Sequence, residues 1–177
     1  MASGDAAGGM TADQPQVSAA LERRGDTLEV KLSGIIDERN ALLDLAEELK
    51  QSGARRIVID AGDVRRINSV GVRDWILMMR ELESVEDLVL QRCSLAIVVQ
   101  LNTVHNFRGS ARITSVMAPY ACPACEAEQV ETIDVENAGA EPEALVAANA
   151  HTCNACGASV EFDDLPDRYF MFLGSAS

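Results

Sequence analysis

The sequence predicts an α/β fold, a mixed or parallel sheet with helices packed against it, followed by a small β-rich module. Two observations lead to this expectation. Between residues 27 and 117, short apolar segments with strand periodicity alternate with amphipathic segments of helical periodicity. After residue 117 this alternation stops, and two Cys-x-x-Cys pairs follow. Aromatic residues make up only 4% of the 177 residues, so aliphatic side chains must build the cores.

The first strand and helix are predicted from residues 27–53. Thr27–Ser33 alternates apolar and polar residues, which is typical of a half-buried strand. Asp37 is expected to cap the N-terminus of a helix whose apolar residues recur at helical spacing over 41–49. Gly53 is expected to end that helix.

Five further elements complete a β-α-β-α-β-α-β order. The apolar run Arg56–Asp60 predicts a central strand covered on both faces. Ser69–Leu82 predicts a second amphipathic helix, and Leu88–Cys93 the next strand. A third helix is expected to begin near Ser94 and to bury Leu95, Val98 and Leu101. Ile113–Met117 is then the last strand, which runs directly into the first cysteine pair.

The charge distribution favours a protein partner. The net charge is −13, and residues 119–177 contain 11 Asp and Glu against the single Arg168. Nucleic acids are bound mainly by Lys and Arg that neutralise phosphates, so we expect no nucleic acid partner, and an anionic membrane surface is disfavoured for the same reason. No segment reaches the roughly 18–20 apolar residues of a membrane span, so no membrane insertion is expected. These observations neither predict nor exclude a homodimer.

The N-terminal residues 1–16 are rich in Gly, Ala, Ser and Asp and predict a flexible tail. They contain no apolar core of a secretory signal, so a cytoplasmic location is expected, where thiols stay reduced. The expected organisation is therefore a tail (1–16), an α/β domain (17–118) and a cysteine-containing domain (119–177).

The two cysteine pairs predict one structural Zn²⁺ ion. Four thiolates in two tight turns form the closed tetrahedral shell of a structural zinc site, with the ligands Cys122, Cys125, Cys153 and Cys156. Strands are expected at Gln129–Val135 and Ser159–Phe162, and the whole segment looks like a zinc ribbon. Because four cysteines complete the shell, His151 is expected to be a surface residue and not a ligand.

The cysteines have three alternative uses. A redox pair needs only one Cys-x-x-Cys, at a strand-to-helix junction. A rubredoxin-like iron site has similar spacing, but with aromatic packing that this segment is expected to lack. A reducing compartment disfavours disulfides.

Three segments in order resemble a STAS domain, the fold of bacterial anti-sigma factor antagonists. These segments are Leu32–Asp37 (LSGIID), Ile57–Asp60 (IVID) and Val64–Val72 (VRRINSVGV), and the resemblance covers about residues 17–118. It implies a STAS-like mixed sheet with helices and a partner that is both an anti-sigma factor and a serine kinase.

In the STAS family, a loop of the type Asp-Ser-Ser/Thr-Gly at the start of the second helix is phosphorylated on its first serine. Asn68, Ser69, Val70 and Gly71 match this loop, which makes Ser69 the phosphoacceptor candidate and the four residues a partner-binding surface. A helix N-terminus favours a phosphate, and the added charge repels a docked partner. Asn68 and Val70 depart from the family pattern, and the alternative is that Asn68 or Ser69 only caps the helix.

No catalytic fingerprint occurs in the sequence, so the predicted function is a non-enzymatic regulatory module that acts by partner switching. The alternative is a non-phosphorylated STAS adaptor in a larger signalling, chemosensory or transport assembly. Two segments keep an open role. Residues 137–149 are expected to form a loop with one or two helical turns, and the apolar residues 169–173 to close the ribbon or to dock on the first domain.

Overall fold

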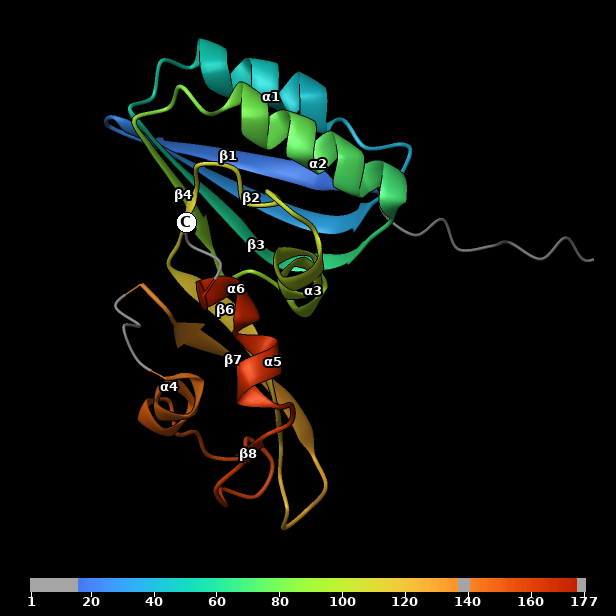
Figure 1. Cartoon of the computed structure of the whole chain (residues 1–177), viewed down its shortest axis with the longest axis vertical. Coiled ribbons are helices and arrows are strands. Elements are labelled where there is room, and N and C mark those ends of the chain that lie inside the picture. Colours follow the sequence, from blue (N-terminus) through green and yellow to red (C-terminus); the bar gives the residue numbers. More distant parts are fainter. Residues whose placement is uncertain (1–15, 137–140, 175–177) are drawn as a thin grey trace, which may run out of the picture.

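The computed structural model describes residues 16–136 and 141–174 (Figure 1). Its larger sheet is mixed, with five strands in the order β1-β2-β3-β4-β5. The first two strands pair antiparallel and the others pair parallel. The strands are β1 (Ser18–Arg24), β2 (Thr27–Ile36), β3 (Arg56–Ile67), β4 (Asp87–Gln91) and β5 (Arg112–Ile113). The predicted α/β class is therefore confirmed, and the Arg56–Asp60 run lies in the central strand, as expected.

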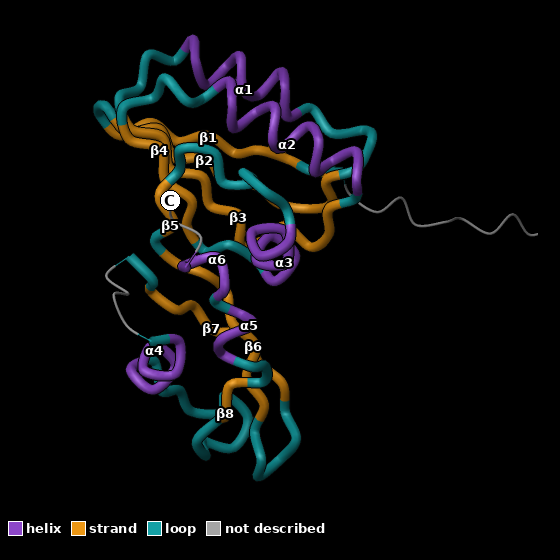
Figure 2. The backbone as a smooth tube through the Cα atoms, in the orientation of Figure 1, coloured by secondary structure: helices purple, strands orange, loops and turns teal. Residues whose placement is uncertain are grey.

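Three helices belong to this sheet: α1 (Leu42–Gln51), α2 (Ser69–Glu81) and α3 (Leu95–Thr103). Figures 1 and 2 show α1 and α2 side by side over one face. The single tryptophan, Trp75, belongs to α2 and its side chain is fully buried. Its ring stacks on Phe107, and its indole N–H donates to the Phe107 carbonyl at 3.0 Å. Helix α3 buries Ile97 and Val98, but Leu95, which was expected in the core, is 39% exposed.

Strand β1 was not predicted. All seven of its residues are exposed, and Ser-Ala-Ala-Leu-Glu-Arg-Arg does not alternate. It becomes a strand because it pairs along its full length with β2, from Ser18 opposite Ser33 to Arg24 opposite Thr27. An edge strand of this kind depends on its neighbour and not on burial of its own side chains. The predicted tail, residues 1–16, lies outside the described residues except for Gln16.

The predicted cap of α1 is wrong. The helix begins at Leu42, and the Leu42 N–H is satisfied by the side-chain oxygen of Asn40 at 3.1 Å. Asp37 instead accepts the N–H of Arg39 at 3.0 Å, which is a local turn formed by an aspartate side chain. The N-cap position itself is Ala41, which has no side-chain acceptor, so the residue before it supplies the hydrogen bond. At the other end, Gly53 follows the helix with a φ of 63°, as expected of a stop.

The predicted last strand is divided between two sheets. Thr114 separates β5 from β6 (Ser115–Ala121), and its N–H donates to Leu90 at 2.9 Å. Strand β6 is the centre of a second sheet of order β7-β6-β8, with β7 (Glu128–Asp134) and β8 (Glu161–Phe162). The boundary expected between residues 118 and 119 lies within β6.

The two sheets are joined through Cys93. Its N–H donates to the Ser115 carbonyl at 3.1 Å, and its carbonyl accepts from the Met117 N–H at 2.8 Å, so Cys93, two residues beyond β4, forms a parallel bridge with Val116 of β6. The Cys93 side chain is fully buried, as expected. Because backbone hydrogen bonds continue from one sheet to the next, no linker separates them.

The described residues after β7 form three short helices: α4 (Pro142–Ala148), α5 (Pro166–Tyr169) and α6 (Met171–Gly174). Helix α4 lies in the 137–149 segment, of which residues 137–140 are outside the described part. In the 169–173 segment, Tyr169, Phe170 and Phe172 are buried. This segment contacts both the second sheet and α3, so it has both of the positions considered for it. No helix in the described part of the chain combines the length and apolar character needed to cross a membrane.

Candidate functional site

The first cysteine pair lies in the tight turn between β6 and β7. The Cys122 N–H donates to the Ala127 carbonyl at 2.9 Å, and the Cys122 carbonyl accepts from Glu126 at 2.9 Å. Glu126 has a φ of 60°, the left-handed conformation that lets the chain return after Cys125. This turn places both sulfur atoms on one side of the backbone.

The second pair repeats this geometry. The Cys153 N–H donates to Ala158 at 2.7 Å, and the Cys153 carbonyl accepts from Gly157 at 2.9 Å. Gly157 has a φ of 76° and takes the place that Glu126 has in the first turn. The Ala155 N–H also donates to the Cys153 sulfur at 3.4 Å. Both turns therefore hold their thiols with the same backbone hydrogen-bond pattern and a left-handed residue at the same position.

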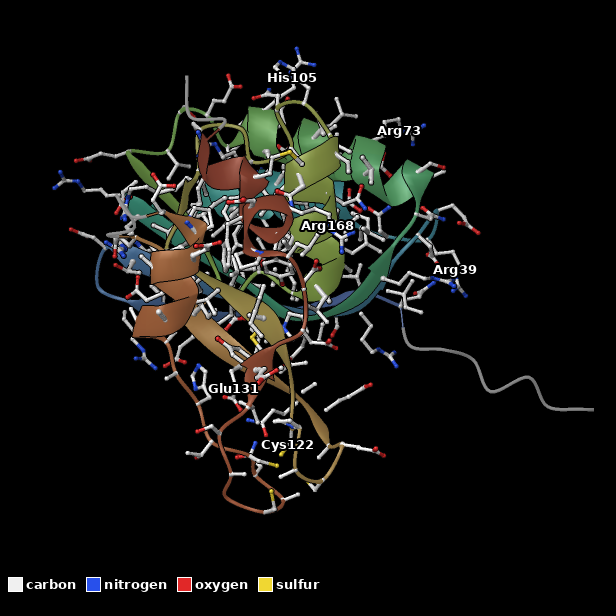
Figure 3. All side chains as sticks on the ribbon, turned by 60° about the horizontal axis from the view of Figure 1, so that its bottom comes forward. Arg39, Arg73, His105, Cys122, Glu131 and Arg168 are labelled. Carbon is white, nitrogen blue, oxygen red and sulfur yellow. The ribbon has the colours of Figure 1, made fainter. Side chains whose placement is uncertain are left out.

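The four sulfur atoms lie within 4.8 Å of one another (Figure 3, around Cys122). Sγ of Cys122 is 3.6 Å from that of Cys156, and Sγ of Cys125 is 3.6 Å from that of Cys153. A tetrahedral ion with sulfur ligands at about 2.3 Å requires neighbouring sulfurs about 3.8 Å apart. The donor set thus has the size and the chemistry to hold a metal ion, and the four cysteines predicted as ligands are brought together.

Backbone dipoles favour ionised sulfur at this site. The N–H groups of Ala155 and Cys156 lower the pKa of Cys153 below its ordinary value. The Ala127 N–H also lowers the pKa of Cys125, but the crowding by the other three thiols raises it overall. Four crowded thiols cannot all lose their protons unless a cation balances the charge, and a bound metal ion provides that charge.

Aromatic side chains pack together close in sequence to the two cysteine turns. The Tyr120 ring meets His151 at 5.0 Å and Phe162 at 5.7 Å, and Phe162 continues to Tyr169 and Phe170. The expectation that this segment lacks aromatic packing is therefore wrong, because residues scattered over 120–172 converge in space. Aromatic packing gives no reason to prefer zinc over iron here.

His151 is not the simple surface residue that was expected. Its side chain is half-buried, and its Nε2 atom is buried with no hydrogen-bond partner among the described residues. The His151 ring packs edge-on against Tyr120 and does not belong to the cysteine group. The four sulfurs thus form the candidate shell without it.

The second candidate site is the loop that begins α2. Asn68 is the N-cap of this helix, and its Oδ1 accepts the Gly71 N–H at 2.9 Å. The Asn68 side-chain amide also donates to the carboxylate of Glu38 at 2.9 Å, and Glu38 lies two residues after the end of β2. The capping role considered for Asn68 or Ser69 therefore belongs to Asn68.

Ser69 is the first residue of α2 and is exposed, whereas Val70 is half-buried. The Ser69 hydroxyl makes no hydrogen bond to any other residue that the structure describes. Gly71 is buried because α2 starts against β2: a Cβ there would lie 2.4 Å from the Ile36 carbonyl oxygen. The glycine is thus required by close packing within the fold.

A buried polar network beside this loop was missed by sequence reasoning. Asp74 is buried, accepting from the Asn40 amide at 3.0 Å and from Arg73 at 2.9 Å. The Asn40 hydrogen bond, followed by that from Arg73, lowers the pKa of Asp74. A signal existed, because Asp74 interrupts the buried face of α2 immediately before Trp75. The network ties the turn before α1 to α2.

No protein-family model matches the sequence, and no curated protein matches it either. Function must therefore be argued from the geometry of these two sites.

Proposed function

We propose that the chain is a non-enzymatic regulatory module that binds protein partners through the N-terminal end of α2, in the manner of a STAS-type anti-sigma factor antagonist. Ser69 is the phosphoacceptor that gates this binding, and the partner is an anti-sigma factor that is also a serine kinase. The second sheet is a zinc ribbon that adds a docking surface. The mixed sheet with helices agrees with the fold that the STAS resemblance implies.

The exposed Ser69 hydroxyl is the observation that carries the proposal. Ser69 occupies the first turn of α2, yet Asn68 caps the helix, so the hydroxyl has no structural task there. A serine whose hydroxyl is exposed and unused can be modified without breaking the cap. The helix start also favours a phosphate through its unpaired N–H groups and its dipole.

Charged residues near Ser69 give a phosphate a physical effect. Arg73 lies one turn further along α2, at the spacing where side chains meet, and it now pairs with Asp74 at 2.8 Å. Glu38 lies on the other side, bound to Asn68. A phosphate carrying about −1.5 to −2 charges attracts Arg73 and repels Glu38. The binding surface thereby changes its charge pattern while the domain stays folded.

The test compares wild-type, Ser69→Ala and Ser69→Asp baits in affinity capture from the native host, with phosphosite mapping by mass spectrometry. We expect phosphate on Ser69, and a kinase-like partner that binds the Ala bait but not the Asp bait. Ser84→Asp is the matched control, since Ser84 is an exposed serine beyond the opposite end of α2. It should bind as wild type does.

One observation favours a second function, a constitutive STAS adaptor in a larger assembly. The family's acidic residue is replaced by Asn68, whose amide both caps α2 and holds Glu38 without any charge of its own. If all four baits capture the same partners and Ser69 carries no phosphate, the adaptor is the correct function.

For the metal centre we propose one Zn²⁺ held by Cys122, Cys125, Cys153 and Cys156. A closed four-thiolate shell leaves no open coordination position, so the ion supplies folding stability and no catalysis. Tetrahedral sulfur sites take zinc or iron, and metal analysis of the purified chain distinguishes them. A red protein, or cysteine pairs that cycle reversibly without metal, would instead indicate an electron-transfer or redox role.

We expect one zinc per chain, lost when Cys122→Ser and Cys125→Ser are combined. Cys93→Ala is the control, since this cysteine is buried in the junction of the two sheets and lies outside the metal group. It should keep the full zinc content. Tight zinc in the double variant would contradict the assignment.

A further inference from the structure

An apolar groove of about 510 Å³ lies between α3 and the C-terminal helices α5 and α6. Its base includes the buried side chains of Val98 and Tyr169, and Pro119 of β6 lies beside them. Figure 1 shows α3, α5 and α6 next to one another where the two sheets meet, and Figure 3 shows Arg168 beside α3. None of the residues that line the groove belongs to α2, so this surface is separate from the Ser69 loop.

The walls of the groove are apolar side chains left in contact with solvent. Leu95 is 39% exposed, Val99 is 54% exposed and Met171 is 50% exposed. Leu95 and Val99 are one turn apart on α3, a helix with no charged residue in its nine positions. Contiguous apolar surface of this kind marks an interaction site more often than scattered single residues do.

The groove is already formed in the free chain. The Asn102 side chain on α3 donates to the carbonyl of Tyr169 at 2.9 Å and accepts the N–H of Phe172 at 2.8 Å. These bonds fix the distance between the two walls. A preformed groove binds more tightly, because little ordering is required when the partner arrives.

The charges around the groove decide between occupants. Of the residues that line the groove, only Asp164 and Arg168 are charged, and they pair with each other. The exposed Asp163 and Asp167 stand next to them in the sequence. The α3 side is neutral, so these two aspartates make the surroundings of the groove net negative. A second copy of this chain would bring identical acidic surroundings against it in a protein of net charge −13. A basic partner meets complementary charge instead.

We propose that this groove receives an amphipathic helix of a protein partner, with aliphatic side chains in the groove and Lys or Arg facing Asp163 and Asp167 beside it. Side chains that recur at i, i+3, i+4 and i+7 form the apolar stripe that is usual in helix-in-groove recognition. The partner is therefore recognised by an apolar stripe flanked by positive charge.

The test uses two synthetic peptides of about 14 residues with leucines at helix-stripe spacing. One has lysines at the remaining positions and the other has glutamates. Binding to the full zinc-loaded chain is measured by fluorescence anisotropy. The groove variant is Val99→Glu, and the matched control is Leu43→Glu, which adds the same charge at a 45% exposed leucine on α1. Circular dichroism verifies that both variants fold.

We expect the lysine peptide to bind wild type and Leu43→Glu equally, with a Kd in the micromolar range, and Val99→Glu at least about tenfold more weakly. The glutamate peptide should bind at least about tenfold more weakly than the lysine peptide. Equal lysine-peptide binding to both variants would reveal a general charge attraction and overturn the proposal. A wild-type dimer in sedimentation equilibrium that Val99→Glu dissociates would overturn it in favour of a second copy.

Discussion

The side-chain amide of Asn102 donates a hydrogen bond of 2.9 Å to the backbone carbonyl of Tyr169, and its oxygen accepts the Phe172 N–H at 2.8 Å. One side chain on α3 thus satisfies backbone groups at the junction of α5 and α6. The Tyr169 hydroxyl in turn donates to the Met117 carbonyl in β6. The C-terminal helices are therefore fixed to α3 and to the second sheet together.

Replacing Asn102 with alanine should destabilise the chain by about 1–3 kcal/mol, because a buried N–H and a buried carbonyl lose their partner. The measurement is urea unfolding of the full chain. Thr103→Ala is the neighbouring control: Thr103 is exposed and its hydroxyl bonds only within α3, so its change should stay within about 0.5 kcal/mol. Equal losses in the two variants would show that the Asn102 bonds do not hold the helices.

Gly71→Ala should destabilise the chain by about 1–3 kcal/mol, the usual cost of overpacking. The new Cβ would meet the Ile36 carbonyl oxygen at 2.4 Å, and a backbone atom cannot move aside as a flexible side chain can. Fluorescence of the single Trp75, on the same helix, reports the unfolding. Gly174→Ala, whose Cβ would have no atom of the described residues within 4 Å, should leave the midpoint unchanged. An unchanged midpoint for Gly71→Ala would contradict the close packing of α2 on β2.

Asp74 makes stability depend on acid pH. Its pKa in the folded chain is lowered by Asn40 and by Arg73, so the folded chain holds the proton less well than the unfolded chain does. The resulting stabilisation is complete above the unfolded pKa of about 3.9 and is lost as the pH falls from there through the lowered folded pKa. Asp74→Asn should therefore flatten the fall of stability below about pH 5.

The measurement is the urea midpoint of wild type and Asp74→Asn from neutral pH down to about pH 3. Acid also protonates the cysteines and releases metal, but this affects both chains alike, so the difference between them isolates Asp74. Asp26→Asn, at an exposed aspartate in the β1–β2 turn, is the control and should follow wild type. Parallel curves for Asp74→Asn and wild type would exclude the coupling.

The parts of the fold that sequence predicted are those whose own side chains encode them. The first half of strand β3 contains the apolar run Ile57–Ile59, and α2 places Trp75 and Met79 on one face, so each is recognisable alone. The cysteine pairs were equally easy to recognise in the sequence. The spacing within each pair fixes a turn, and two such turns supply the four sulfur ligands of a tetrahedral site. In each case a local pattern determines the structure.

The parts that were missed depend on residues far apart in the chain. Strand β1 exists only because β2 lies beside it, and the division at Thr114 depends on the Leu90 carbonyl. The groove needs α3 and the C-terminal helices together. Leu95 has the spacing of a core residue, but it lines this groove and stays exposed to solvent. No periodicity within one segment records such contacts.

The two cysteine turns allow one further prediction, because corresponding positions hold different residues in the same conformation. Gly157 has a φ of 76° and Glu126 a φ of 60°. Alanine at Gly157 meets no atom within 4 Å, so its only cost is the left-handed backbone, about 1–2 kcal/mol for a residue with a Cβ.

Glu126 already bears that cost, so Glu126→Ala should change little, whereas Gly157→Ala should weaken zinc binding by about five- to thirtyfold. Competition with a chromogenic chelator measures both affinities. Glu126→Gly completes the set and should strengthen binding, because glycine adopts this conformation freely. Equal weakening by the two alanine variants would mean that side-chain contacts, and not the backbone conformation, set the affinity of the turns for metal.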